Sequence, residues 1–115
     1  MAPLFGLVQG RPLVVSSRIE EALTADEAER CGRLMAEENP AACVNLLGPC
    51  ASIYRWQGEI ETATEYRALF KTTPQLAREL ARRIAALHSY DLPAIQIWPA
   101  AAGDAVAAWI DDSTR

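Results

Sequence analysis

The sequence predicts an α+β fold in which two strand–helix–strand halves interleave into one four-stranded antiparallel sheet. Two observations lead to this prediction. The apolar pattern switches between a period of two and a period of 3.6 in the order strand, helix, strand, strand, helix, strand. The stretch 52–71 holds two extended segments joined by a tight turn at Gln57-Gly58. Right-handed crossovers put both helices on one sheet face, which is the ferredoxin-like βαββαβ arrangement.

The first half begins with a strand at Leu13–Ser17 and continues into a helix near Thr24. Thr24 and Glu27 have the spacing of a capping box, in which each side chain bonds the backbone amide of the other residue. The helix ends near Asn39-Pro40, because a residue before proline avoids the helical region. Its apolar stripe consists of Ala28, Cys31, Leu34 and Met35.

The next segment, Ala41–Leu47, is apolar on both of its faces. This pattern is typical of a central strand covered on both sides. Gly48-Pro49 interrupts the segment and predicts a bend or a bulge. The sheet face without helices is too apolar to meet water alone, so we expect another subunit to cover it.

The hairpin is the longest element that we expect. Ile60–Lys71 alternates between an apolar and a mixed face, and it exceeds the usual strand length of about five or six residues. Its far end must overhang a small sheet and leave backbone groups unpaired. Such an edge favours pairing with another chain.

The second half begins with a helix at Thr73, with Pro74 at its first position. This helix ends at His88-Ser89, and its apolar stripe consists of Leu76, Leu80, Ile84 and Leu87. A last main strand follows at Ala94–Trp98. Ala105–Ile110 then predicts one or two helical turns with Trp109 as the packing anchor.

The size of the chain, 115 residues, indicates a single domain with an N-terminal extension at 1–12, a core at 13–98 and a C-terminal segment at 99–115. The net charge of -4 argues against nucleic-acid binding. Three cysteines without close spacing favour reduced thiols in the cytoplasm over disulfides. Met1–Val8 is apolar but too short for a membrane span, and it lacks the basic start of a signal peptide.

No strong catalytic motif is present, so we expect a protein that is not an enzyme. His88 ends a helix, where a cation is favoured, and it is either a capping residue or a metal ligand. Cys43 lies between apolar neighbours and is either an inert packed thiol or a soft ligand for copper. A single histidine cannot form a multi-histidine site within one chain, although symmetric copies could bring several together.

The hairpin carries a charged rim and two aromatic residues. Glu59, Glu61, Glu65 and Lys71 form the rim. Surface or inter-subunit ion pairs are the default interpretation of such charges, and acid–base catalysis is the less favoured one. Tyr54 and Trp56 precede the turn, where aromatic side chains are typical anchors for a partner surface.

Several motifs, in order, resemble the divalent-cation tolerance protein CutA family. They are A-A-C-V-N at 41–45, S-I-Y-R-W-Q-G-E-I-E at 52–61, K-T at 71–72, H-S-Y at 88–90 and A-W-I at 108–110, together with Glu65 and Pro93. The spacing agrees over nearly the whole chain, from about Leu13 to Ser113. Any one of these motifs alone would be a weak signal.

The resemblance implies a homotrimer with an architecture similar to the PII signalling proteins and no catalytic activity. It also implies a link to divalent metal tolerance, with copper as the metal bound by some members. The residues expected to line the inter-subunit clefts are Trp56, Glu59, Glu65, Lys71 and Tyr90. His88 and Cys43 are then the candidate metal ligands.

The chain departs from the family pattern at its metal-linked positions. Ser16 and Ser17 stand where copper-linked members have a cysteine, and Leu87 precedes the single histidine. Arg67 stands where an apolar residue is usual. A PII-like sensor therefore remains the alternative function, with Lys71 and Arg67 supplying positive charge to a small anionic ligand.

Overall fold

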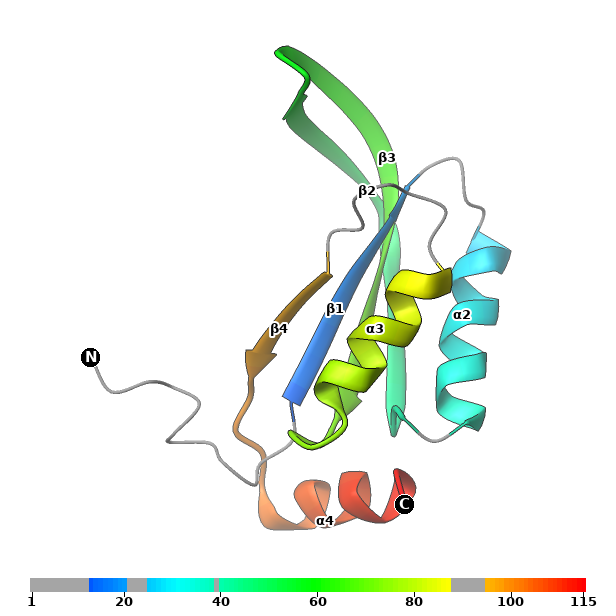
Figure 1. Cartoon of the computed structure of the whole chain (residues 1–115), viewed down its shortest axis with the longest axis vertical. Helices are drawn as coiled ribbons and strands as arrows, with labels where there is room; N and C mark the ends of the chain where they lie inside the picture. Colours follow the sequence, from blue (N-terminus) through cyan, green and yellow to red (C-terminus); the bar gives the residue numbers. More distant parts are fainter. Residues whose placement is uncertain (1–12, 21–24, 39, 88–94) are drawn as a thin grey trace, which may run out of the picture.

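The described residues fold into a four-stranded antiparallel sheet with two helices on one face and a third at its end (Figure 1). The computed structural model describes residues 13–20, 25–38, 40–87 and 95–115. The elements are β1 (Leu13–Glu20), α2 (Ala25–Glu37), β2 (Cys43–Trp56), β3 (Glu59–Thr72), α3 (Ala77–Leu87), β4 (Ile95–Pro99) and α4 (Asp104–Ser113). The strand order β2-β3-β1-β4 confirms the predicted ferredoxin-like arrangement.

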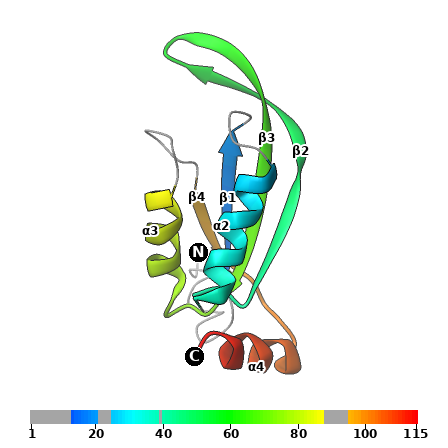
Figure 2. The same cartoon turned by 90° about the vertical axis from the view of Figure 1, so that its right-hand side faces the viewer.

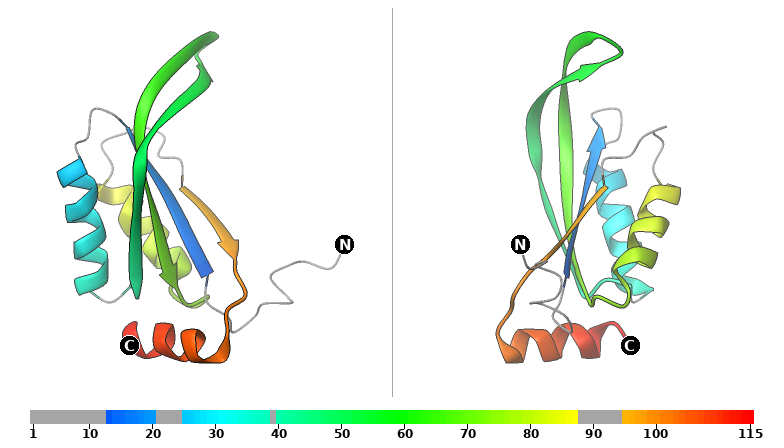
Figure 3. Two further views of the ribbon diagram at one scale, coloured as in Figure 1. Left: turned by 180° about the vertical axis from the view of Figure 1, so that it is seen from behind. Right: turned by 60° about the vertical axis from the view of Figure 1, so that its left-hand side comes forward.

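The hydrophobic core lies between the sheet and the helices α2 and α3, which cover the same face (Figure 2). Its buried members are Met35, Ala41, Ala68, Phe70, Ala77, Leu80 and Ile84. Paired residues of an antiparallel ladder share a face, so Val44 opposite Phe70 and Leu46 opposite Ala68 also point toward the helices. We call the opposite side, seen from behind in Figure 3, the open face; on β3 it carries Glu65, Arg67, Leu69 and Lys71.

Helix α2 packs closely on β2 through its predicted apolar stripe. Met35 and Ala28 are buried, and Cys31 and Leu34 are half-buried. A Cβ atom on Gly32 would lie 2.9 Å from Cγ1 of Val44, so only glycine allows this approach. The predicted cap residue Thr24 lies outside the described residues.

The connection after α2 is held by two hydrogen bonds. The Thr72 hydroxyl donates to the Pro40 carbonyl at 2.7 Å, and the Ala42 amide donates to the Lys71 carbonyl at 2.8 Å. These contacts fix the start of β2 against the end of β3.

The hairpin confirms the predicted turn and the predicted interruption. Gln57 (φ 50°) and Gly58 (φ 84°) both lie in the left-handed region, as a type I′ turn requires. The register of β2 against β3 shifts between Leu47 and Cys50, which places a bulge at Gly48-Pro49. The Gly48–Pro49 peptide bond is cis.

The hairpin also overhangs the sheet as predicted. Strand β1 ends at Glu20, opposite Glu65, so among the described residues only β2 pairs with residues 59–64 of β3. This two-stranded extension rises beyond the rest of the chain in Figure 1. Strand β1 extends to Glu20, beyond the predicted end at Ser17.

The prediction that Ala41–Leu47 forms a central strand is wrong for the single chain. Strand β2 is an edge strand, and Leu46 and Leu47 are exposed. An apolar pattern indicates that a strand face is covered. It does not show whether a helix of the same chain or another subunit covers that face.

Helix α3 begins later than predicted. The Leu76 amide bonds the Thr73 carbonyl at 3.2 Å, which makes a tight turn, and the helix proper starts at Ala77. Ala77 joins the buried face, whereas Leu87 of the predicted stripe is exposed.

The C-terminal helix is longer than predicted and packs through a different residue. Helix α4 spans Asp104–Ser113, and Ile110 is its buried residue at 2% exposure. Trp109 is 49% exposed, so it is not the anchor within one chain. The Thr114 hydroxyl closes the helix by donating to the Ile110 carbonyl at 2.9 Å.

No helix among the described residues combines the length and the apolarity that a bilayer crossing requires.

Candidate functional site

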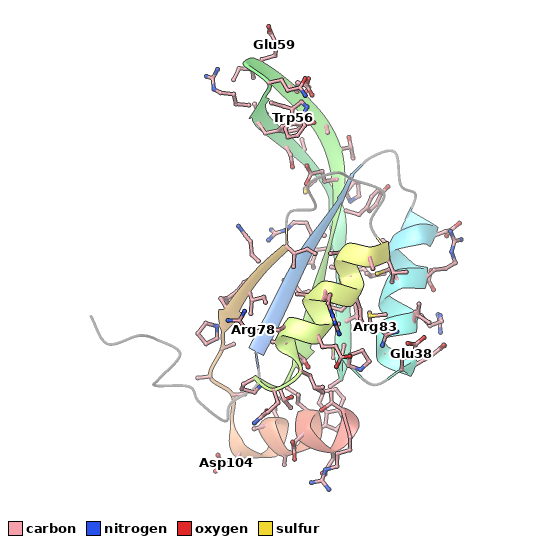
Figure 4. All side chains as sticks on the ribbon, viewed as in Figure 1. Glu38, Trp56, Glu59, Arg78, Arg83 and Asp104 are labelled. Atoms are coloured by element: carbon pink, nitrogen blue, oxygen red, sulfur yellow. The ribbon has the colours of Figure 1, made fainter. Side chains whose placement is uncertain are left out.

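The tip of the hairpin brings Trp56 and Glu59 together. The two residues are the last cross-strand pair before the turn, and both side chains stand at the tip in Figure 4. The next pair on this side is Tyr54 with Glu61, whose hydroxyl and carboxylate lie 3.4 Å apart. The predicted aromatic anchors and the charged rim therefore share one side of the hairpin.

The other side of the overhang presents exposed apolar side chains to solvent. Ile53 is 74% exposed and Ile60 is 59% exposed. The exposed large apolar side chains of the hairpin are Leu46, Leu47, Ile53, Trp56 and Ile60. Clustered apolar exposure of this kind marks an interaction surface.

Glu65 lies where the overhang joins the sheet, and it is nearly buried. Its side chain is 7% exposed, and its Oε2 atom has no hydrogen-bond partner. Two residues further along the open face, the buried Nε atom of Arg67 also lacks a partner. Buried polar atoms are normally bonded, so these two require an explanation.

Lys71 is half-buried near the far end of β3, opposite Cys43. Lys71 and Glu65 are six strand positions apart, a separation of about 20 Å at 3.3 Å per residue. An ion pair between them within one chain is therefore excluded. Any partnership of Lys71 with Glu59 or Glu65 needs a second chain.

Cys43 is half-buried, and its Sγ atom lies 3.7 Å from Oδ1 of Asn45. Among the described residues, no three His, Cys, Asp or Glu side chains gather in a way that could hold a metal ion. His88 and Tyr90 lie outside the described residues, so their expected roles stay predictions. The donor set of one chain, as far as it is described, does not form a metal centre.

All three cysteines are free thiols. Burial raises the pKa of the Cys31 thiol above its ordinary value, because a low-dielectric surrounding disfavours the thiolate. Cys31 is therefore a packed thiol of α2, as its position on the apolar stripe predicted.

A groove between α2 and β2 was not predicted. Its volume is about 410 Å³, and its lining residues are Glu29, Gly32, Arg33, Ala36, Glu37, Val44 and Leu46. Gly32, beside the apolar stripe of α2, was the sequence signal for this groove, because it lets α2 approach the strand closely. The burial of Glu65 was also missed, since alternation alone places that residue on a mixed face.

Comparison with known proteins gives consistent matches. Residues 19–113 match the family described as CutA1 divalent ion tolerance protein. The chain is 37% identical over 95 residues to a divalent-cation tolerance protein CutA of Archaeoglobus fulgidus, covering 82% of this chain and 92% of that protein. It is 41% identical over 76 residues to a protein CutA homolog of Danio rerio, covering 66% of this chain and 51% of that longer protein.

The fold agrees with a solved structure as well. The structure titled as the periplasmic divalent cation tolerance protein CutA from Archaeoglobus fulgidus superimposes with a TM-score of 0.82 at 31% identity. The superposition covers 90% of this chain and 99% of the archaeal one. Sequence and fold agree over most of the chain, and the protein belongs to the CutA1 divalent ion tolerance family.

Proposed function

We propose that the protein acts in divalent metal ion tolerance as a homotrimer and catalyses no reaction. Family membership supports the link to divalent ions. The overhanging hairpin carries the proposal of an assembly, because a two-stranded ribbon with apolar side chains on both sides is only marginally stable in water.

A ring of three subunits would cover this exposed surface. In the described part of one chain, the two edge strands of the sheet are β2 and β4. If one edge pairs with the other edge of the next copy, the contact is heterologous, and such contacts form a ring when the rotation between neighbours closes. Leu46 and Leu47 on the β2 edge would then be covered.

In this proposal, the predicted cleft residues act together only when they come from different subunits. Trp56 serves as the packing anchor, and Glu59 and Glu65 serve as acceptors. Lys71 supplies a cation from a neighbouring copy, since it is too far from Glu65 within one chain. Tyr90 completes the cleft in this proposal.

Copper is the metal that the proposal favours. Thiol sulfur suits Cu(I), and imidazole nitrogen suits Cu and Zn. The proposed ligands are Cys43 and His88, and symmetric copies must contribute to the site, because the described part of one chain gathers no three donors.

Native mass spectrometry with and without Cu(II) and Zn(II) tests the metal proposal. We expect trimers that bind metal in multiples of three, and a loss of affinity of about tenfold or more in His88→Ala and Cys43→Ser. Cys31→Ser is the matched control, because this thiol packs in α2. Unchanged affinity in His88→Ala would show that His88 is not a ligand.

A PII-like sensor is the second candidate, and Arg67 favours it. The buried Nε atom of Arg67 has no hydrogen-bond partner, so the open face holds a donor that is not yet bonded. A nucleotide or metabolite bound in a trimer cleft would raise the melting temperature, because it stabilises the folded state. A flat response to a nucleotide panel at high concentration would count against this candidate.

The cytoplasm is the compartment that we propose. Three free thiols fit a reducing environment. The archaeal relative is titled periplasmic, so family membership does not fix the compartment. Fractionation of the native host, with detection by a specific antibody, tests this point.

A further inference from the structure

Cys50 and Glu65 form a cross-strand pair beside the bulge of the hairpin. They stand directly opposite each other in the ladder of β2 and β3, so both side chains lie on the open face. The Cβ atoms of two such residues are about 4.5–5.5 Å apart. A thiol and a carboxylate at this separation are two donor groups within reach of one bound ion.

The bulge is what places Cys50 on the open face. Leu47 stands opposite Arg67 and shares that face with it. Strict alternation would turn Cys50, three positions after Leu47, toward the helices. The register shift between Leu47 and Cys50 adds one residue to β2 and reverses this assignment. The thiol is therefore paired with the carboxylate because the strand is interrupted at Gly48-Pro49.

The carboxylate of Glu65 is not compensated as a buried carboxylate normally is. Its side chain is 7% exposed, and within the described part of the chain its Oε2 atom has no hydrogen-bond partner. Burying an ionised carboxylate is costly unless a cation or hydrogen-bond donors compensate its charge. The oxygen beside the Cys50 thiol is therefore free to bind a cation.

The neighbours of the pair on the open face leave access to it. The next pair toward the tip is Ser52 with Ala63, so the side chains beside Cys50 and Glu65 on that side are small. Cys50 is half-buried, and its sulfur is a free thiol. On the other side lies Arg67, two positions from Glu65 and about 7 Å along the strand.

We propose that Cys50 and Glu65 bind a divalent cation of the zinc type, with water completing its coordination. Cysteine sulfur and glutamate oxygen are both ligands of Zn(II). Binding releases the thiol proton to solvent. The thiolate and the carboxylate then carry two negative charges, which outweigh the single positive charge of Arg67.

The site differs from the copper site proposed above. It lies within one chain and uses neither Cys43 nor His88, so it depends neither on the trimer nor on those ligands. Two protein ligands are fewer than the four of a structural zinc site. We therefore expect an ion that exchanges with solvent and is not locked into the fold.

Titration of the reduced protein with Co(II) tests the site, because Zn(II) is a d¹⁰ ion and gives no d–d spectrum. The titration uses the Cys43→Ser chain, so that the proposed copper ligand contributes no sulfur. We expect a sulfur-to-cobalt charge-transfer band that added Zn(II) removes by competition. Adding Cys50→Ser should abolish the band, and adding Glu65→Gln should weaken Co(II) binding by about tenfold or more.

Cys31→Ser in the same Cys43→Ser chain is the matched control, because the Cys31 thiol packs in α2 away from the hairpin. This variant should keep the band. A band that survives Cys50→Ser would overturn the inference, and so would an unchanged Co(II) affinity in Glu65→Gln. The trimer and the Cys43–His88 proposal would be unaffected by either result.

A second measurement leaves the pair itself unaltered, which covers the case in which a variant fails to fold. X-ray absorption of the Cys43→Ser chain with one equivalent of Zn(II) reads the atoms around the ion. We expect one sulfur at about 2.3 Å and oxygen at about 2.0–2.2 Å. A shell without sulfur, or a shell that contains imidazole, would contradict the assignment to Cys50 and Glu65.

Discussion

At the scale of residues, single contacts decide whether the ends of the sheet are held. The hydroxyl of Thr72 is buried and donates to the Pro40 carbonyl at 2.7 Å, which ties β3 to the connection after α2. The neighbouring Lys71 carbonyl accepts from Ala42. This corner is therefore fixed by specific hydrogen bonds as well as by apolar packing.

Replacement of Thr72 by valine keeps the side-chain volume and removes the donor. The Pro40 carbonyl is left unsatisfied, so the free energy of unfolding should fall by about 1–3 kcal/mol. Denaturant unfolding at one fixed protein concentration measures the change, and a midpoint equal to that of the wild type would contradict the prediction.

Two apolar residues of α3 should differ sharply although the sequence pattern treats them alike. Ile84 is fully buried and Leu87 is exposed. Ile84→Ala should cost about 2–5 kcal/mol, because it leaves a cavity in the core. Leu87→Ala should stay within about 1 kcal/mol, as surface substitutions do. Thermal and denaturant unfolding of the two variants compare them directly, and a larger loss in Leu87→Ala would show that this end of α3 is covered in the assembly.

At the scale of elements, the turn of the hairpin depends on glycine. Gly58 has a φ of 84°, and a side chain in the left-handed region costs about 1–2 kcal/mol. Gly58→Ala should therefore lower stability by about that amount, although no atom stands within 4 Å of the added Cβ. Gly103→Ala is the matched control, because its φ of -62° suits any residue and its surroundings are equally open. A similar loss in both variants, measured by thermal unfolding, would refute the role of the backbone conformation.

Most elements could be predicted because their patterns are local. The alternation along β3, the stripe of α2 and the Gln57-Gly58 turn all follow from side-chain periodicity and backbone preference. The start of α3 was missed because Pro74 suits a tight turn as well as a first helical position. The length of α4 was missed because its alanines carry little periodic signal.

The surroundings of single residues were harder to predict than the elements. Trp109 was the expected anchor of α4 because of its size, yet the smaller Ile110 faces the core. Cys43 was correctly placed on a strand, but the sequence does not show which side chains stand beside it. Nothing in the pattern around Glu65 indicated that its carboxylate would be buried, because burial depends on contacts between distant strands.

At the scale of the whole molecule, the shape of the chain is explained by assembly. Helices α2 and α3 cover one face of the sheet, and within the described part of the chain no helix lies along the open face or the overhang (Figures 1 and 2). The apolar pattern of Ala41–Leu47 predicted a covered strand, and a second copy would provide the missing cover on β2. The misassigned central strand and the exposed hairpin therefore have one physical cause.

The mass of the wild-type protein in solution is the most direct test of the proposed assembly. Sedimentation velocity over a range of micromolar concentrations should give a single species of three times 12.6 kDa. Replacing the exposed Ile53 and Ile60 by serine should shift the mass toward the monomer, with the sheet itself intact by circular dichroism. A wild-type mass of 12.6 kDa at every concentration would contradict the central claim that the hairpin and the open face are buried between three copies.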